Sequence, residues 1–312
     1  MKRLIAVFLL TVLLAGCGTD KPLPEQTVAQ TTAPEETILP EVTEPKRELE
    51  TLPVLSTAPP YKTPNVDRYR PGWNVGSCRR LEGKVYAVVF LVDDVSSSWT
   101  EETGQEFLLR CVTPGFAYLQ EQAEYWGVEL EFDYYFFMTD EKNSMYYPRE
   151  FSPELDGAVD NSDILDVLAG NFGFADKFSM NLYFESYFDT DEVLYFVALN
   201  KEGHSYTVMD SEDNGRDLLE YSVFFTGHID GARNGAFVVA HETMHNFGAE
   251  DYYDPYGNLP NRKALAEQVY PDDLMMRWDD DVTRLYVSDA TAFTVGWVDS
   301  PPAELMGADW WS

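Results

Sequence analysis

Residues 84–92 limit the folds open to this chain more than any other segment. They read KVYAVVFLV, so every position after the lysine is apolar and most are β-branched or aromatic. A strand with one face in water alternates polar and apolar residues, whereas a continuous apolar run is typical of a strand buried on both faces. The run therefore predicts an α/β fold in which this strand is covered on both sides.

Helix and strand patterns follow this strand in alternation. Thr100 and two glutamates begin a periodic apolar pattern that predicts a helix to about residue 126, which Pro114 should kink or split. Residues 128–137 return to a strand pattern. Between residues 138 and 191 the only clear pattern is a short helix at 162–168. The order strand, helix, strand again indicates an α/β (α+β) domain.

The second half of the chain predicts more strands and two helices. Its strands are expected at 193–199, 206–209 and 221–226. A turn follows, with Asn234 as the candidate N-cap of a helix over residues 236–247. Ser288 is the candidate cap of a last helix that runs to about residue 297. Residues 71–312 are numerous and apolar enough for one large domain.

The first residues have the pattern of a secretory signal peptide. Lys2 and Arg3 precede an apolar run that is too short to span a bilayer. The run ends in Leu-Ala-Gly-Cys17, which resembles the lipobox of bacterial lipoproteins. That resemblance implies that residues 1–16 are removed and that lipid on Cys17 anchors the chain at the bacterial surface or another extracytoplasmic membrane face. The alternative is an ordinary signal peptide with a cysteine there by chance.

Residues 17–70 have the composition of a linker. Between residues 18 and 60 the chain is rich in proline, threonine and glutamate and has no aromatic residue. Such a segment cannot bury enough apolar surface to offset the entropy lost on ordering. We therefore expect a disordered stalk between the lipidated Cys17 and the folded domain.

The charge of the chain excludes one class of partner. It has 22 Lys and Arg against 54 Asp and Glu, a formal net charge of −32. Such a surface repels phosphate backbones, so we expect no nucleic-acid binding. The acidic segments 250–254 and 279–281 could bind calcium, but neither has EF-hand spacing, and solvated acidic loops are the favoured interpretation.

Two cysteines remain besides Cys17. Cys78 and Cys111 would form one disulfide outside the cytoplasm or stay as two buried thiols, and the sequence favours neither. No pair of cysteines has the spacing of a metal site.

The predicted helix at 236–247 carries a candidate metal site. His241 and His245 are four residues apart and thus lie one turn apart on the same helix face, which suits two ligands of one Zn²⁺. Glu242 lies about 100° around the helix, where it can act as general base without binding the metal. The alternative is that two of only four histidines coincide by chance on a surface helix.

The segment from His241 to Asp251, HETMHNFGAED, resembles the extended zinc-binding motif of metzincin metalloproteases. The match is to the variant with aspartate in place of a third histidine, as in the snapalysin-like group. The resemblance implies that Asp251 is the third ligand and that the chain hydrolyses peptide bonds in a protein or peptide substrate. Gly248 can adopt a left-handed conformation, which lets the chain turn back towards the metal.

The resemblance also implies a fold: a twisted mixed sheet, a backing helix, the metal helix, and a small C-terminal subdomain with a methionine turn. Met275 or Met276 is the candidate for that turn. Some members place a tyrosine two residues after the methionine, where this chain has Arg277 or Trp278 instead. The nearby tyrosines, which are weak substitutes, are Tyr252, Tyr253 and Tyr286.

Two other interpretations stay open. The chain would be a non-catalytic surface lipoprotein if the motif were fortuitous, or a gluzincin-like peptidase if Glu267 on a later helix were the third ligand. His204 and His228 have no partner at ligand spacing and are not expected to bind the metal. For a peptidase, we expect an extended substrate to add a strand beside residues 206–209.

Overall fold

The computed structural model describes residues 77–137, 145–153, 163–209, 219–253 and 260–302, which all belong to the compact unit Leu49–Ser312. The predicted leader 1–16, the lipidation site Cys17 and the linker 17–70 lie outside the described residues. None of the helices in the described part is both long and apolar enough to cross a bilayer.

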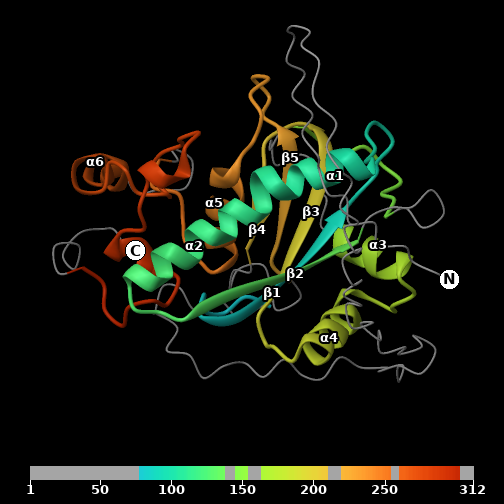
Figure 1. The fold of residues 1–312 in the computed structure, drawn as a ribbon, viewed down its shortest axis with the longest axis horizontal. Coiled ribbons are helices and arrows are strands. Elements are labelled where there is room, and N and C mark those ends of the chain that lie inside the picture. Colours follow the sequence, from blue (N-terminus) through green and yellow to red (C-terminus); the bar gives the residue numbers. More distant parts are fainter. Residues whose placement is uncertain (1–76, 138–144, 154–162, 210–218, 254–259, 303–312) are drawn as a thin grey trace, which may run out of the picture. The chain divides into compact units, whose positions relative to one another are not determined.

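The centre of the unit is a five-stranded mixed sheet (Figure 1). Its strands are β1 (Gly83–Leu91), β2 (Leu130–Phe137), β3 (Val193–Glu202), β4 (Tyr206–Val208) and β5 (Tyr221–Gly227). They lie in the order β2-β1-β3-β5-β4, in which the first four are parallel and β4 pairs antiparallel with β5 at the edge. The α/β (α+β) class and the mixed sheet are therefore confirmed.

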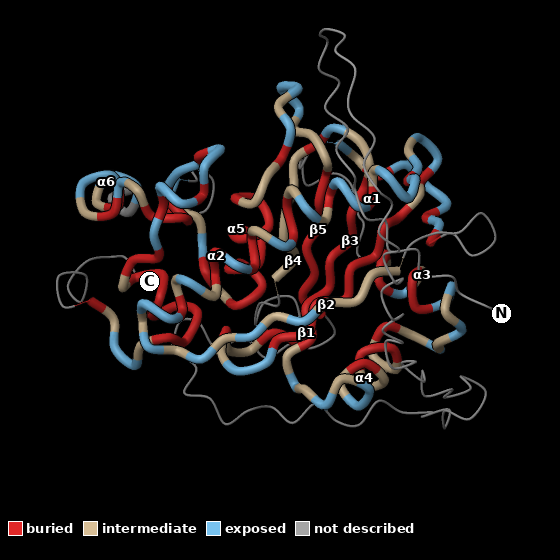
Figure 2. The backbone as a smooth tube through the Cα atoms, viewed as in Figure 1, coloured by how far each residue is buried: buried red, intermediate tan, exposed pale blue. Residues whose placement is uncertain are grey.

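Strand β1 is buried on both faces, as its apolar run predicts. Successive side chains of a strand point to opposite faces, and those of β1 enter two separate hydrophobic clusters. One cluster contains Val85, Ala87, Val89 and Leu91, and the other contains Tyr86, Val88 and Phe90. Figure 2 shows the central strands as buried along most of their length.

A long helical segment packs on one face of the sheet. It consists of α1 (Glu101–Phe107), a π-helical turn η2 (Leu108–Val112) and α2 (Thr113–Tyr125). Pro114 lies at the start of α2 and has no amide proton to bond to the carbonyl of Arg110. The turn before it widens into a π-helix. Pro114 thus disturbs the α-helical pattern, but the helical segment continues without a gap from Glu101 to Tyr125, so the helix is not split.

Helices α3 (Ile164–Asn171) and α4 (Lys177–Phe188) cover the other face (Figure 1). The predicted helix at 162–168 thus begins at Ile164 and continues to Asn171. Helix α4 was not predicted, because its many aromatic residues give no clear polar face. Asp176 caps it by accepting a hydrogen bond from the amide of Ser179 at 2.7 Å.

The helix that carries the candidate site, α5 (Ala236–Asn246), packs on the same face as α2. It is followed by α6 (Pro260–Val269), the 3₁₀ turn η4 (Val282–Arg284) and α7 (Asp289–Thr294). Ser288 caps α7 as predicted. The last helix ends at Thr294, however, and not near residue 297.

The predicted role of Asn234 is wrong. The N-cap of α5 is Gly235, which has no side chain to cap the helix. Asn234 is buried, and its Nδ2 donates to the carbonyl of Phe225 on β5 at 2.8 Å. The side chain therefore fastens the loop before α5 to the sheet instead of binding the helix amides.

Both cysteines in the described part are free and buried. The Cys78 Sγ donates to the carbonyl of Val193, and the Cys111 Sγ donates to the carbonyl of Asn234. Of the two alternatives, the buried thiols are the ones that occur. Burial raises the pKa of both thiols, which keeps them protonated and unreactive.

Candidate metal centre

Helix α5 is buried along nearly its whole length, although it carries ionisable residues. All its residues from 237 to 246 are buried, including His241, Glu242 and His245. Burying such groups is costly unless hydrogen bonds or opposite charges compensate. The contacts of these three side chains therefore show how their burial is compensated.

Both imidazoles are oriented by backbone carbonyls. The Nδ1 of His241 lies 3.0 Å from the carbonyl oxygen of Leu274, and the Nδ1 of His245 lies 2.6 Å from that of Ala249. A carbonyl oxygen only accepts hydrogen bonds, so each Nδ1 carries the proton and donates. In the neutral ring this leaves the lone pair on Nε2, which is the tautomer that a metal-binding histidine needs.

The two Nε2 atoms converge with a carboxylate. They lie 3.1 Å from each other, and the Oδ1 of Asp251 lies 3.1 Å from that of His241 and 3.2 Å from that of His245. Three electron-rich atoms this close repel one another unless a cation is shared among them. His241, His245 and Asp251 thus form a group that could hold a metal ion.

The pKa values of His245 and Asp251 also indicate a site for positive charge. Burial alone would lower the pKa of His245, but the hydrogen bond and charge of Asp251 outweigh it and raise that pKa to about 9. Burial would raise the pKa of Asp251, yet hydrogen bonds and charges from both histidines hold it far below its usual range. A bound cation would satisfy the same carboxylate in place of the imidazolium proton.

The end of α5 directs Asp251 to the histidines. Gly248 has a φ of 94°, the left-handed conformation predicted for it. Its amide donates to the carbonyl of His245 at 2.9 Å, and the amide of Ala249 donates to that of Met244 at 3.1 Å. This pair of bonds is a Schellman motif, which reverses the chain at a helix end. The reversal places Asp251 beside the face that carries both imidazoles.

The predicted methionine turn lies against the ligands. Met275 and Met276 are buried, and the turn is joined to the site at two points. The carbonyl of Leu274 accepts a hydrogen bond from the His241 imidazole. The carbonyl of Met275 accepts one at 2.9 Å from the amide of Tyr252, the residue that follows Asp251. One turn thus supports a histidine and the segment of the carboxylate.

Asp273 holds this turn in place and was missed from the sequence. It is fully buried and accepts hydrogen bonds from the amides of Met275 and Ser288 and from the hydroxyl of Thr291. Burial raises its pKa above the ordinary value. Its contacts join the turn to the start of α7. Nothing in the sequence distinguishes it from Asp272, the acid beside it.

The carboxylate of Glu242 faces the edge strand. Its Oε2 accepts a hydrogen bond from the Thr207 hydroxyl on β4 at 2.8 Å. Burial raises the pKa of Glu242, and the nearby histidines and this hydrogen bond offset part of the rise. The predicted general base therefore lies between helix α5 and strand β4, beside which the substrate was expected to bind. Thr207 was not singled out from the sequence.

Aromatic rings flank the ring of His241. Phe237 stacks on one side, with ring centroids 5.2 Å apart, and Tyr253 stacks at 6.1 Å. Trp278 contacts Phe237 edge-on at 6.4 Å. Tyr253 and Trp278 are both exposed. Of the tyrosines considered as substitutes for the family's tyrosine, Tyr253 is stacked on the His241 ring. The hydroxyl of Tyr252 instead forms a hydrogen bond with that of Thr291 at 2.9 Å.

Glu267, the rival third ligand, lies apart from the group. It is on α6 with an exposed side chain and forms an ion pair with Lys263 at 4.0 Å. His204 and His228 are likewise not members of the group, and their rings contact each other. The geometry favours Asp251 over Glu267.

Carboxylates of the acidic segment 279–281 already accept hydrogen bonds from an arginine and from backbone amides. The Oδ2 of Asp279 accepts from Arg277 at 2.8 Å, and its Oδ1 accepts from the amide of Asp281 at 3.0 Å. Asp281 also caps the turn η4. The carboxylates are thus hydrogen-bonded within the loop, which gives no support to the calcium interpretation.

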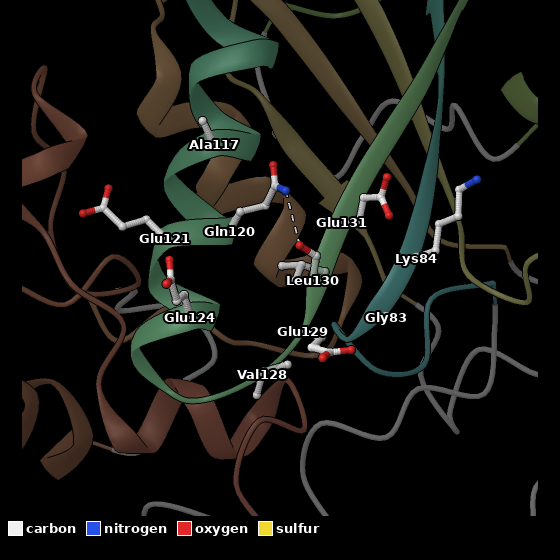
Figure 3. Close-up of a pocket in the computed structure, with 10 residues that line it drawn as sticks. All are labelled: Gly83, Lys84, Ala117, Gln120, Glu121, Glu124, Val128, Glu129, Leu130 and Glu131. Carbon is white, nitrogen blue, oxygen red and sulfur yellow. Dashed lines mark hydrogen bonds between the residues drawn. The ribbon is translucent and has the colours of Figure 1, made fainter.

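A pocket of about 800 Å³ lies between the end of α2 and the start of β2 (Figure 3). Within it Gln120 donates to the carbonyl of Leu130 at 3.2 Å. Its lining includes Lys84 and four glutamates, namely Glu121, Glu124, Glu129 and Glu131. No residue of the metal group lines it, so this pocket is separate from the candidate centre.

Comparisons with known proteins do not identify the chain. Neither the protein-family models, nor the curated proteins, nor the solved structures include a significant match to it. The site is therefore interpreted from its own geometry.

Proposed function

We propose that the chain is a zinc-dependent metallopeptidase of the metzincin type, in which His241, His245 and Asp251 bind Zn²⁺ and Glu242 is the general base. The observation that carries the proposal is the convergence of two Nε2 atoms and Asp251 Oδ1 at 3.1–3.2 Å. A catalytic zinc takes three protein ligands and leaves a further position open.

The spacing of the three atoms supports zinc. Bonds of about 2.0–2.2 Å at tetrahedral angles separate ligand atoms by about 3.3–3.6 Å, so the group needs to open by only a few tenths of an ångström. Two imidazoles and one carboxylate are also a donor set that zinc accepts in hydrolytic sites. The carbonyls of Leu274 and Ala249 hold the imidazoles in the required tautomer.

Zinc, when bound, supplies a Lewis acid that polarises a peptide carbonyl and lowers the pKa of water. Glu242 takes a proton from the water as the water oxygen adds to the carbonyl carbon. The same carboxyl then gives the proton to the nitrogen as the C–N bond breaks. Burial favours this exchange because it raises the pKa of Glu242 above that of an exposed glutamate.

The edge of the sheet supports an extended peptide as substrate. Among the described strands, β4 pairs only with β5. A peptide can therefore add a strand to the other edge of β4. Glu242 contacts β4 through Thr207, which would bring the scissile bond close to the base. The exposed rings of Tyr253, beside His241, and of Trp278, beside Phe237, would contact apolar side chains of the peptide.

Lipidation at Cys17 is the second part of the proposal. The sequence around Cys17 resembles a lipobox, and an acyl chain there would keep the peptidase at an extracytoplasmic membrane face. The Cys17→Ser variant should leave the membrane fraction or accumulate as an unprocessed precursor. A variant that is processed and still fractionates with membranes would contradict the anchor.

The test of the activity is a digest of a peptide library by the full-length chain. We expect cleavage that a chelator abolishes and that added Zn²⁺ restores, together with one equivalent of zinc by elemental analysis. One equivalent of zinc without any cleavage would favour the non-catalytic surface lipoprotein instead. Cleavage that persists in chelator would exclude the metal mechanism.

A further inference from the structure

The edge strand and the metal helix meet at a chain of polar side chains. Thr207 on β4 is in register with Ser222 on β5, and their hydroxyl oxygens are 2.8 Å apart. The Thr207 hydroxyl also lies 2.8 Å from Glu242 Oε2. On the other side of Ser222, the Nδ2 of Asn246 donates to the Ser222 hydroxyl. Glu242, Ser222 and Asn246 are buried.

The direction of these hydrogen bonds follows from Asn246. Its Nδ2 lies 2.8 Å from the carbonyl oxygen of Glu242, which only accepts, so the amide nitrogen and not the amide oxygen faces this side. The nitrogen then donates to Ser222 as well. With its oxygen accepting, Ser222 can donate its own proton to Thr207, which is closer at 2.8 Å than the Glu242 carbonyl at 3.4 Å. Thr207 then has two acceptors on Glu242, the carboxylate Oε2 at 2.8 Å and the backbone carbonyl at 3.1 Å. The carboxylate is the closer of the two and the charged one, so the Thr207 hydroxyl donates to it.

We propose that Thr207 is a positioning residue for Glu242, with its donated hydrogen bond set in direction by Asn246 and Ser222. This inference rests on the proposed function, because it assigns a role relative to the general base. In the described part, hydrogen bonds from side chains reach Oε2 of Glu242 and not Oε1. The two carboxylate oxygens are thus made different: one is held by the strand, and the other is left to exchange the proton.

The position of Thr207 links substrate binding to the base. Neighbouring side chains of a strand point to opposite sides of the sheet, while the backbone of β4 offers its outer edge to a peptide. A peptide that pairs with this edge would fix β4 and therefore the Thr207 hydroxyl. The loss of that hydroxyl should reduce the rate of the chemical step and leave the backbone pairing intact.

The experiment compares full-length variants with zinc bound. Thr207→Val removes the hydroxyl at nearly constant shape, and Thr207→Ser retains it. We expect Thr207→Val to lower kcat about 10- to 100-fold, the range for losing a hydrogen bond to a charged group, with KM and zinc affinity within about twofold of wild type. Thr207→Ser should recover most of the rate. Thr226→Val is the matched control, since Thr226 is on β5 and its hydroxyl bonds to Asn200 at 3.3 Å, away from Glu242.

A second comparison asks whether Thr207 acts through Glu242. In a Glu242→Gln background, Thr207→Val should cost less than about twofold further, because two residues that act as a unit are not additive. An equal loss in both backgrounds would overturn the assignment. If Thr207→Val fails to fold by circular dichroism, Thr207→Ala provides the same test without a branched side chain.

The outcomes separate the two proposals. A wild type without chelator-sensitive hydrolysis overturns the proposed function, and the role of Thr207 falls with it. A wild type that hydrolyses peptides while Thr207→Val matches it in kcat overturns only the positioning role. A loss in Thr207→Val that appears in KM alone also contradicts it, since that would make Thr207 a substrate contact.

Discussion

The four histidines of the chain form two pairs with the same ring geometry. The rings of His241 and His245 have centroids 4.7 Å apart at an angle of 90°, and those of His204 and His228 have the same distance and the same angle. Only the first pair belongs to a group of three ligand-type residues in the described part. Ring proximity alone therefore does not give a group that could hold a metal ion, and the surroundings of the two pairs differ in other respects.

The buried pair has each element that a metal site needs. His241 and His245 are on one helix, so their relative position is fixed by backbone geometry. The carbonyls of Leu274 and Ala249 hold both Nδ1 protons, and Asp251 meets both Nε2 atoms. Low exposure strengthens the electrostatic attraction for a cation.

The other pair lacks these elements. His204 follows β3 and His228 follows β5, so two loops must keep their positions for the rings to stay together. The Nδ1 of His228 lies 3.0 Å from Asp230, whose side chain is 66% exposed, so water weakens the interaction. The difference teaches that a tautomer fixed by backbone carbonyls and a sheltered carboxylate distinguish a group that could hold a metal ion from two adjacent imidazoles.

The largest expected effect concerns Glu242, the proposed general base, which lies next to His241 on α5. Glu242→Gln should lower peptide hydrolysis at least about 100-fold, because the general base is lost. Zinc content should stay at one equivalent, since the three ligands are unchanged. Steady-state kinetics and elemental analysis of the same sample measure both. Turnover at the wild-type rate would refute the mechanism.

The next effect separates Asp251 from its rival. Asp251→Ala should weaken zinc binding by more than about 100-fold, which exceeds the loss typical of a residue that only supports a ligand. The matched variant Glu267→Ala should leave zinc affinity unchanged, because Glu267 is exposed and paired with Lys263. Competition with a chromogenic chelator measures both. The gluzincin-like arrangement would replace the present one if Glu267→Ala lost zinc and Asp251→Ala kept it.

The sequence predicted the parts of the fold that have strong local patterns. The run at residues 84–92 indicated a strand buried on both faces, and β1 is one. The antiparallel edge strand and the metal helix also lie where they were expected. Helix α4 was missed because its burial depends on aromatic contacts with distant strands, which leave no periodic pattern in the sequence.

The site was predictable to the extent that its residues are close in sequence. Helix periodicity placed His241 and His245 on one face, and the metzincin resemblance, supported by the glycine turn, added Asp251 to them. Thr207 and Asp273 act across 35 and 18 residues, on Glu242 and Thr291 respectively, and no local signal marks either of them. Asn234 was misjudged because a polar residue before a helix suits a cap and a loop anchor equally well.

A smaller effect should come from the turn that completes the buried group. Gly248→Ala places a Cβ at a φ of 94°, which should lower the free energy of unfolding by about 1–2 kcal/mol. It should also weaken zinc binding, because the turn positions Asp251. Gly127→Ala is the control, since Gly127 follows α2 with a φ of 74° and an added Cβ meets nothing within 4 Å. Urea unfolding and zinc titration should show a stability loss in both variants and an affinity loss in Gly248→Ala alone.

The smallest effect is expected at the half-buried pair, His204 and His228, which gives the most direct test of the comparison. His204→Ala and His228→Ala should leave the tight zinc equivalent and the peptidase rate within about twofold of wild type, because neither imidazole contributes to the group of three. The reciprocal variants His241→Ala and His245→Ala should each abolish tight binding. Isothermal titration with Zn²⁺ distinguishes these results directly, since each variant removes one imidazole from a pair of the same ring geometry. A second tight equivalent in wild type that disappears in His228→Ala would show that two perpendicular imidazoles suffice, and that the carbonyls of Leu274 and Ala249 and the carboxylate of Asp251 are not what makes the centre.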